Sequence, residues 1–129
     1  MKNNLYFKLL FLEIILILIV GLLFYSLSST KLAGQIAGSL FVFIGLFIFT
    51  ILITQKRFQT LTSYMCLTHL CISIIILAYR YFNPGISFAE ISYWGITGGH
   101  LHKLGTFIYF LLMLSTLFEG IKFNTNKGL

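Results

Sequence analysis

Three histidines and one glutamate are the side chains of this chain best suited to chemistry, because imidazole and carboxylate groups carry protons and bind metals. Glu13 and His69 each lie inside a long apolar run, whereas His100 and His102 lie at the start of the last run. An ionisable group inside an apolar membrane segment is costly, so it usually has a partner or a function. These four residues define the candidate sites.

Depth along the chain pairs Glu13 with His69. Glu13 lies about seven residues into the first run, and His69 lies about nine residues into the third, roughly 10 and 14 Å from the same side at 1.5 Å per residue. If these two helices touch, Glu13 can accept a hydrogen bond from His69, which lowers the cost of burying both. We predict this intramembrane polar pair. The alternative interpretations are that Glu13 carries a proton, or that it points toward the interface beside Lys8.

A b-type haem held by His69 and His102 is the second candidate site, with one neutral imidazole on each side of the iron. Measured from the outer boundary near Arg80, His69 lies roughly 16 Å deep and His102 roughly 6 Å deep. Two axial ligands of one iron should lie at similar depth, so this difference counts against the site. The sequence therefore favours a protein without a cofactor, with haem b as the alternative.

His100 and His102 form the third candidate, a copper or zinc site at the outer face. On a regular helix these two side chains diverge by about 200°. They would face one way only if Gly98-Gly99 keeps this piece out of a helix, because side chains at i and i+2 share a face in an extended chain. The only further ligand nearby is Glu90. Without a metal, both histidines meet water and lipid headgroups.

The elements that position these residues are apolar helices. The chain is 58% hydrophobic and 9% charged, with a mean hydropathy of +0.95, far outside the range of ordinary globular domains. Runs of this length span a bilayer as helices, because a lone segment in lipid must satisfy its backbone internally. We predict an all-α integral membrane four-helix bundle, a single domain over residues 1–129, with spans at about 6–26, 34–54, 60–79 and 98–119.

Most of the connections are short, at 27–33 and 55–59, so consecutive helices should run antiparallel as neighbours. The third connection, 80–96, contains the turn signal Asn83-Pro84-Gly85 and an aromatic-rich piece. We expect this loop to lie flat at the interface, with a short amphipathic helix at 88–93.

Glycines mark the expected packing face of the second span. Gly34, Gly38 and Gly45 include a small-xxx-small pair, which permits close approach of a neighbouring helix. We therefore predict that these three glycines face another helix of the bundle.

Basic residues predict the orientation. Six lie on the side that carries both termini and three on the other, which favours cytoplasmic termini, as in a bacterial inner-membrane protein. The net charge of +6 comes from scattered residues rather than from a clustered basic face, so no nucleic-acid partner is expected. The six are Lys2, Lys8, Lys56, Arg57, Lys122 and Lys127, and the three are Lys31, Arg80 and Lys103.

These features favour a non-enzymatic accessory, assembly or structural subunit of a membrane complex. Its expected partners are the lipid bilayer and either other membrane subunits or further copies of the same chain. Two alternatives remain open: a redox subunit whose haem is held by His69 and His102, and a small proton- or solute-conducting oligomer that uses Glu13, His69 and Glu119.

Overall fold

The predicted fold class is confirmed by a computed structural model, which describes residues 4–28, 30–83 and 85–128. It is a bundle of four helices: α1 at Leu5–Ser26, α2 at Thr30–Thr54, α3 at Leu61–Phe82 and α4 at Gly98–Gly128. Each helix is long and apolar enough to cross a membrane. Pro84, the centre of the predicted turn, lies outside the described residues.

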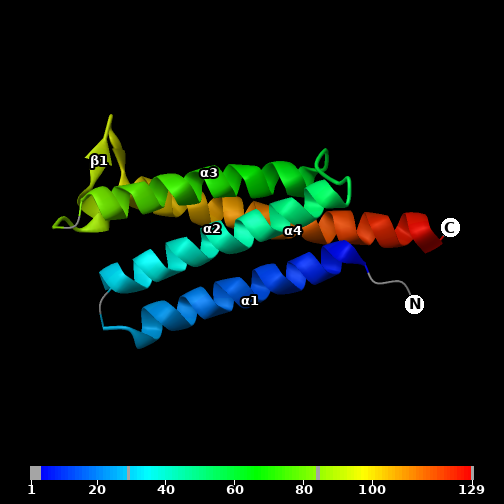
Figure 1. Cartoon of the computed structure of the whole chain (residues 1–129), viewed down its shortest axis with the longest axis horizontal. Coiled ribbons are helices and arrows are strands. Elements are labelled where there is room, and N and C mark those ends of the chain that lie inside the picture. The colour runs from blue at the N-terminus through cyan, green and yellow to red at the C-terminus, as the bar shows by residue number, and fades with distance from the viewer. Residues whose placement is uncertain (1–3, 29, 84, 129) are drawn as a thin grey trace.

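The four helices lie side by side along the long axis of the molecule (Figure 1). Both chain ends lie at one end of the bundle, here called the terminal end, and the loop between α3 and α4 lies at the other, here called the hairpin end. Each helix packs against the next, and α4 packs against α1, which closes a ring. In this ring α1 and α3 occupy opposite corners, while α3 makes its most extensive contacts with α2 and α4.

Side-chain caps fix where three helices begin. The Asn4 side chain accepts a hydrogen bond from the Tyr6 amide at 2.9 Å, and Thr60 accepts one from the Ser63 amide at 3.3 Å. At the start of α4, the Thr97 hydroxyl accepts from the His100 amide at 3.1 Å. Helix α4 extends nine residues beyond the predicted 119, to Gly128. Apolarity marks only the part of a helix that lies in lipid, whereas its backbone hydrogen bonds can continue into water.

A small hairpin separates α3 from α4, in place of the expected helix at 88–93. A 3-10 turn at Phe88–Glu90 leads into strands β1 at Ser92–Tyr93 and β2 at Ile96–Thr97, with Tyr93 opposite Ile96. Trp94 and Gly95 connect the strands with φ values of 51° and 79°, the positive values that a two-residue type I′ turn requires. Helical periodicity in this aromatic piece was therefore misleading, because turn geometry decides its structure.

The hairpin stands crosswise to the helices (Figure 1) and is fixed at its base. The Tyr79 hydroxyl donates to the Ile96 carbonyl at 2.8 Å, and the Gly98 amide donates to the Ile91 carbonyl at 2.8 Å. Tyr79 and Ile91 also pack with Leu101 in a small buried cluster. The loop is therefore a structured cap on the hairpin end.

Exposed aromatic side chains gather near the hairpin end. Trp94 at the tip of the hairpin is 99% exposed, and Tyr25, Tyr81 and Phe82 at the ends of α1 and α3 are also exposed. Aromatic rings favour the boundary between lipid and water. Together with the four apolar helices, this arrangement describes a multi-pass protein in contact with a lipid bilayer.

The two halves of the bundle differ in packing. In the terminal half, large side chains meet in one core, and in the hairpin half several inward positions on α2 and α4 are occupied by small residues. Among these, Gly34, Ala37 and Gly38 lie on α2 and Gly105 on α4, all buried. Small residues leave unfilled volume where helices do not close fully around them. The large core residues are Tyr6, Leu9, Ile48, Leu52, Leu70, Tyr109 and Leu112.

Candidate functional site

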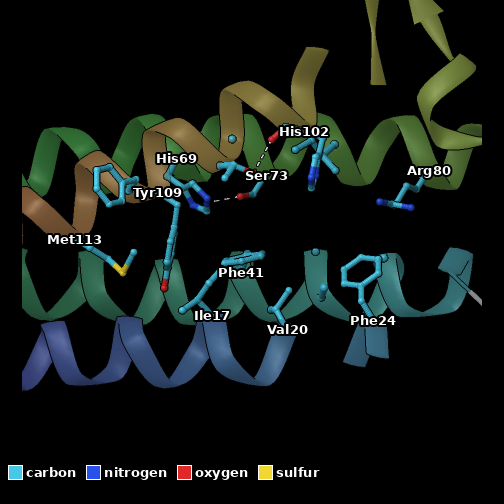
Figure 2. A pocket seen from close by; sticks show the side chains of 17 residues that line it. Ile17, Val20, Phe24, Phe41, His69, Ser73, Arg80, His102, Tyr109 and Met113 are labelled. Carbon is cyan, nitrogen blue, oxygen red and sulfur yellow. Dashed lines mark hydrogen bonds between the residues drawn. The ribbon is translucent and has the colours of Figure 1, made fainter. Parts of the chain in front are cut away.

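A cavity of about 230 Å³ lies between the four helices in the hairpin half (Figure 2). Six side chains with polar groups line it, three from α3 and three from α4, within walls that are otherwise mostly apolar. The polar lining residues are His69, Ser73, Arg80, His102, Thr106 and Tyr109, and apolar ones include Ile17, Val20, Phe24, Ala37, Ile76, Phe110 and Met113. Mostly apolar walls with a few convergent polar groups are typical of ligand sites.

Three rings close the cavity toward the terminal end. His69 lies between Phe41 and Tyr109, with ring centroids 5.2 and 4.9 Å away, and Phe41 and Tyr109 are themselves 5.2 Å apart. The His69 Nδ1 atom is 3.4 Å from the Ser73 hydroxyl one helical turn away. The imidazole is thus held in place by ring packing and one weak hydrogen bond, and it forms the deep end of the cavity.

The side of the cavity between α1 and α4 is open. The contacts that join these helices lie in the terminal half, where Asn4 Nδ2 donates to the Gly120 carbonyl at 2.8 Å and Tyr109 donates to the backbone carbonyl of Glu13. Further toward the hairpin end, Thr106 and Phe110 of α4 line the cavity and are exposed. In a bilayer this opening faces the hydrocarbon region, so a lipid-soluble molecule can reach the cavity from the side.

The structure gives Glu13 a different partner from the predicted one. Its Oε2 atom accepts a hydrogen bond from the Thr116 hydroxyl at 3.0 Å, while Oε1 is buried without a partner among the described residues. No hydrogen bond joins Glu13 to His69 in that part of the chain. Because α1 and α3 occupy opposite corners of the ring, Tyr109 of α4 lies between them, with its ring against His69 and its hydroxyl on the Glu13 carbonyl.

The geometry does not fit a haem between His69 and His102. Tyr109 packs against His69 and therefore lies at its depth, and His102 precedes Tyr109 by seven residues, roughly 10 Å along the helix. The cavity, at about 230 Å³, is also below the lower limit of about 300 Å³ for pockets that hold drug-sized ligands, and a haem is larger than such ligands. The two histidines line one cavity but cannot face a common iron.

The outer histidines are held apart by helix α4. The helix begins at Gly98, so His100 and His102 diverge by about 200°, and the extended conformation that a shared metal requires is absent. His100 Nδ1 accepts a hydrogen bond from the Thr97 amide at 3.4 Å, which makes His100 part of the helix cap. No group of three or more metal-binding side chains lies together among the described residues.

The three glycines of α2 all lie against α3. A Cβ atom at Gly38 would lie 2.6 Å from Leu77, and one at Gly45 would lie 2.7 Å from Leu70. At Gly34 it would lie 2.2 Å from the Arg80 guanidinium carbon, so a side chain at this position would displace the guanidinium group. Gly34 and Gly38 also line the cavity, so these glycines allow close packing on one side and leave volume on the other.

Arg80 and Tyr109 are the site residues that sequence reasoning missed. Arg80 was used to predict orientation and to mark the outer boundary of the third span, although a cation two residues before the end of an apolar helix can turn inward as well as outward. Tyr109 belongs to the polar face of α4, but nothing in the sequence shows which helix that face meets. Comparisons with known protein families, with curated proteins and with solved structures found no match.

Proposed function

We propose that this membrane protein binds a lipid-soluble small molecule in the cavity between its helices. The observation that carries the proposal is a mostly apolar cavity whose lining residues on α1 and α4, among them Phe24, Thr106 and Phe110, are exposed on helices of membrane length. Three polar groups in its wall, those of Ser73, Arg80 and His102, supply orientation, as polar groups in ligand pockets commonly do.

The wider role that we propose is that of a non-enzymatic accessory subunit of a larger membrane assembly. The support is that most of the described chain lies in four membrane-length helices, and the structured segments that it has outside them are a 3-10 turn and the small hairpin. An accessory subunit of this kind contributes a bound ligand and a packing surface, while other chains contribute any catalytic centre.

The proposed binding is tested by blocking the side opening. Thr106 is exposed at the opening, so the larger ring in Thr106→Phe is expected to occupy it and to lower cross-linking of a diazirine-bearing stearic acid at least about fivefold, by loss of apolar contact. The yield is measured in phosphatidylcholine nanodiscs, and peptide mapping should place the parent's cross-links on residues that line the cavity.

Leu104→Phe is the matched control, because Leu104 is exposed on the same helix but does not line the cavity. Its cross-linking should equal that of the parent. Equal yields from Thr106→Phe and the parent would show that the stearic acid binds elsewhere, which overturns the proposed function.

We further propose a bacterial inner membrane, with the terminal end in the cytoplasm, on the basis of the charge distribution along the sequence. The predicted result is that an impermeant thiol reagent labels Gly85→Cys but not Gln59→Cys in intact cells, in a background of Cys66→Ala and Cys71→Ala. Both positions are exposed, at opposite ends of the bundle. Labelling of Gln59→Cys alone would reverse the orientation, and equal labelling of both would contradict a four-span topology.

A further inference from the structure

Arg80 has an unusual position for a cation in a bundle of apolar helices. It lies on the last turn of α3, with its guanidinium carbon 4.1 Å from the centre of the Phe88 ring and packed directly on Gly34. Its Nε atom is buried and has no hydrogen-bond partner among the described residues. The guanidinium is therefore fixed between the hairpin loop and α2.

Among the residues that the structure describes, no carboxylate neutralises Arg80. The chain has three acidic residues, all within the described ranges. Glu13 bonds to Thr116, Glu119 accepts from the Leu61 amide at 3.2 Å, and Glu90 is exposed and lines neither the cavity nor its neighbour described below. A half-buried cation without an anion is costly in a membrane protein. An anion from outside the chain would remove that cost.

Arg80 also joins two cavities. Besides the one between the helices, it lines a second cavity of about 490 Å³ at the hairpin end, whose wall includes Lys31, Asn83 and Ser87. Phe24 lines both cavities as well, so they meet beside these two residues. The second cavity is at the level of the lipid headgroups if the helices span the bilayer. A cationic, polar cavity therefore lies directly beside a mostly apolar one.

The two adjacent cavities match the two parts of an amphiphile, a polar headgroup and an apolar chain. Figure 2 shows Arg80 and Phe24 at the hairpin end of the inner cavity, and His69 and Tyr109 at its deep end. The inner cavity, of about 230 Å³, has mostly apolar walls, which is the environment that an alkyl chain favours. Guanidinium binds carboxylate and phosphate oxygens with two parallel hydrogen bonds.

We propose that the ligand is an anionic amphiphile whose carboxylate or phosphate headgroup binds Arg80 in the outer cavity, while one alkyl chain occupies the inner cavity. This inference rests on the proposed function and adds the class of ligand. Lys31 lines the headgroup cavity and increases its positive potential. The anion replaces the absent carboxylate partner of Arg80, and the chain fills volume that the small residues of α2 and α4 leave open.

The first test uses the unaltered protein and varies only the probe. Diazirine-bearing stearic acid and its methyl ester have the same chain but differ in charge. We expect half-maximal cross-linking of the acid at a concentration about tenfold lower than that of the ester, the scale of a charge-assisted hydrogen bond. Equal concentrations for acid and ester would overturn the anionic headgroup while leaving the binding cavity intact.

The second test varies the cation. Arg80→Gln should abolish the preference for the acid, and Arg80→Lys should keep part of it, because it retains the charge but not the paired hydrogen bonds. Lys103→Gln is the matched control, an exposed cation at the same end that lines neither cavity, and it should behave like the parent. An unchanged preference in Arg80→Gln would overturn the role of Arg80.

A third comparison identifies the source of the anion. The same photoreactive chain is placed on phosphatidylglycerol and on phosphatidylcholine, and millimolar inorganic phosphate is added as a competitor. Preference for phosphatidylglycerol over the free acid assigns a membrane lipid, and the reverse assigns a fatty acid. Cross-linking of phosphatidylcholine more strongly than both would overturn the anionic headgroup, and displacement of the acid by an equal concentration of inorganic phosphate would overturn the contribution of the alkyl chain.

Discussion

A single methyl group at position 98 is expected to destabilise the protein by about 3 kcal/mol, at the upper end of the usual cost of overpacking. In Gly98→Ala the new Cβ atom would lie 1.9 Å from the backbone carbonyl oxygen of Phe88, because the loop that contains Phe88 crosses over the start of α4. A backbone atom cannot rotate away, so the loop must move and lose the hydrogen bond from the Gly98 amide to Ile91. The free energy of unfolding is measured by SDS titration in mixed micelles.

The adjacent glycine provides the control. A Cβ atom at Gly99 would have its nearest neighbour, the Thr97 hydroxyl, at 3.7 Å, which is an ordinary contact. Gly99→Ala should therefore leave stability unchanged or raise it by less than about 1 kcal/mol, through higher helix propensity. If Gly98→Ala and Gly99→Ala unfold at the same SDS concentration, the loop does not cross α4 as described.

The second large effect is a loss of stability, expected when the hydrogen bond between Glu13 and Thr116 is removed. Thr116→Val should cost about 2 kcal/mol, because it leaves a buried carboxyl group without its hydrogen bond. In a Glu13→Met background the same change should cost less than about 0.5 kcal/mol, because no carboxyl group remains to be satisfied. The difference is a coupling of roughly 1.5 kcal/mol, measured by a double-mutant cycle of unfolding free energies.

Two further double-mutant cycles distinguish the contact between Glu13 and Thr116 from the neighbouring contacts of Tyr109 and His69. Tyr109→Phe should cost the same with and without Glu13→Met, because the tyrosine bonds to the backbone carbonyl of residue 13. His69→Leu should also be additive with Glu13→Met, because the two side chains do not meet. A coupling between Glu13 and His69 as large as that with Thr116 would restore the pair predicted from the sequence.

The sequence predicts the four helices well because lipid removes the alternatives. A chain segment in hydrocarbon must form its hydrogen bonds internally, so an apolar run of sufficient length becomes a helix whatever its neighbours are. Outside the hydrocarbon this constraint disappears. The segment from Ser92 to Thr97 could have been recognised as a hairpin from its β-forming residues on either side of Trp94-Gly95, but its aromatic spacing also fits a short helix.

The candidate site was predicted only in part, because depth fixes one coordinate of a residue and leaves its rotation about the helix axis undetermined. Glu13 and His69 were assigned similar depths, yet the ring of helices places Tyr109 between them. Rotation also decides whether Arg80 points outward to lipid headgroups or inward over Gly34. Its inward direction depends on contacts with Phe88, in the loop that follows α3, and with Gly34 of α2, which lies far from it in the sequence.

Helix α1 is attached to α4 by hydrogen bonds near its start, as far as Glu13. Among the described residues, the hydrogen bonds that join it to α4 are made at Asn4 and Glu13, in its first half. The remaining part of α1, from Ile14 to Ser26, is roughly 20 Å long, and its buried residues Leu16 and Val20 pack against Ala37 of α2. Because this part of α1 carries exposed apolar side chains, we expect bilayer thickness and lateral pressure to alter its separation from α4.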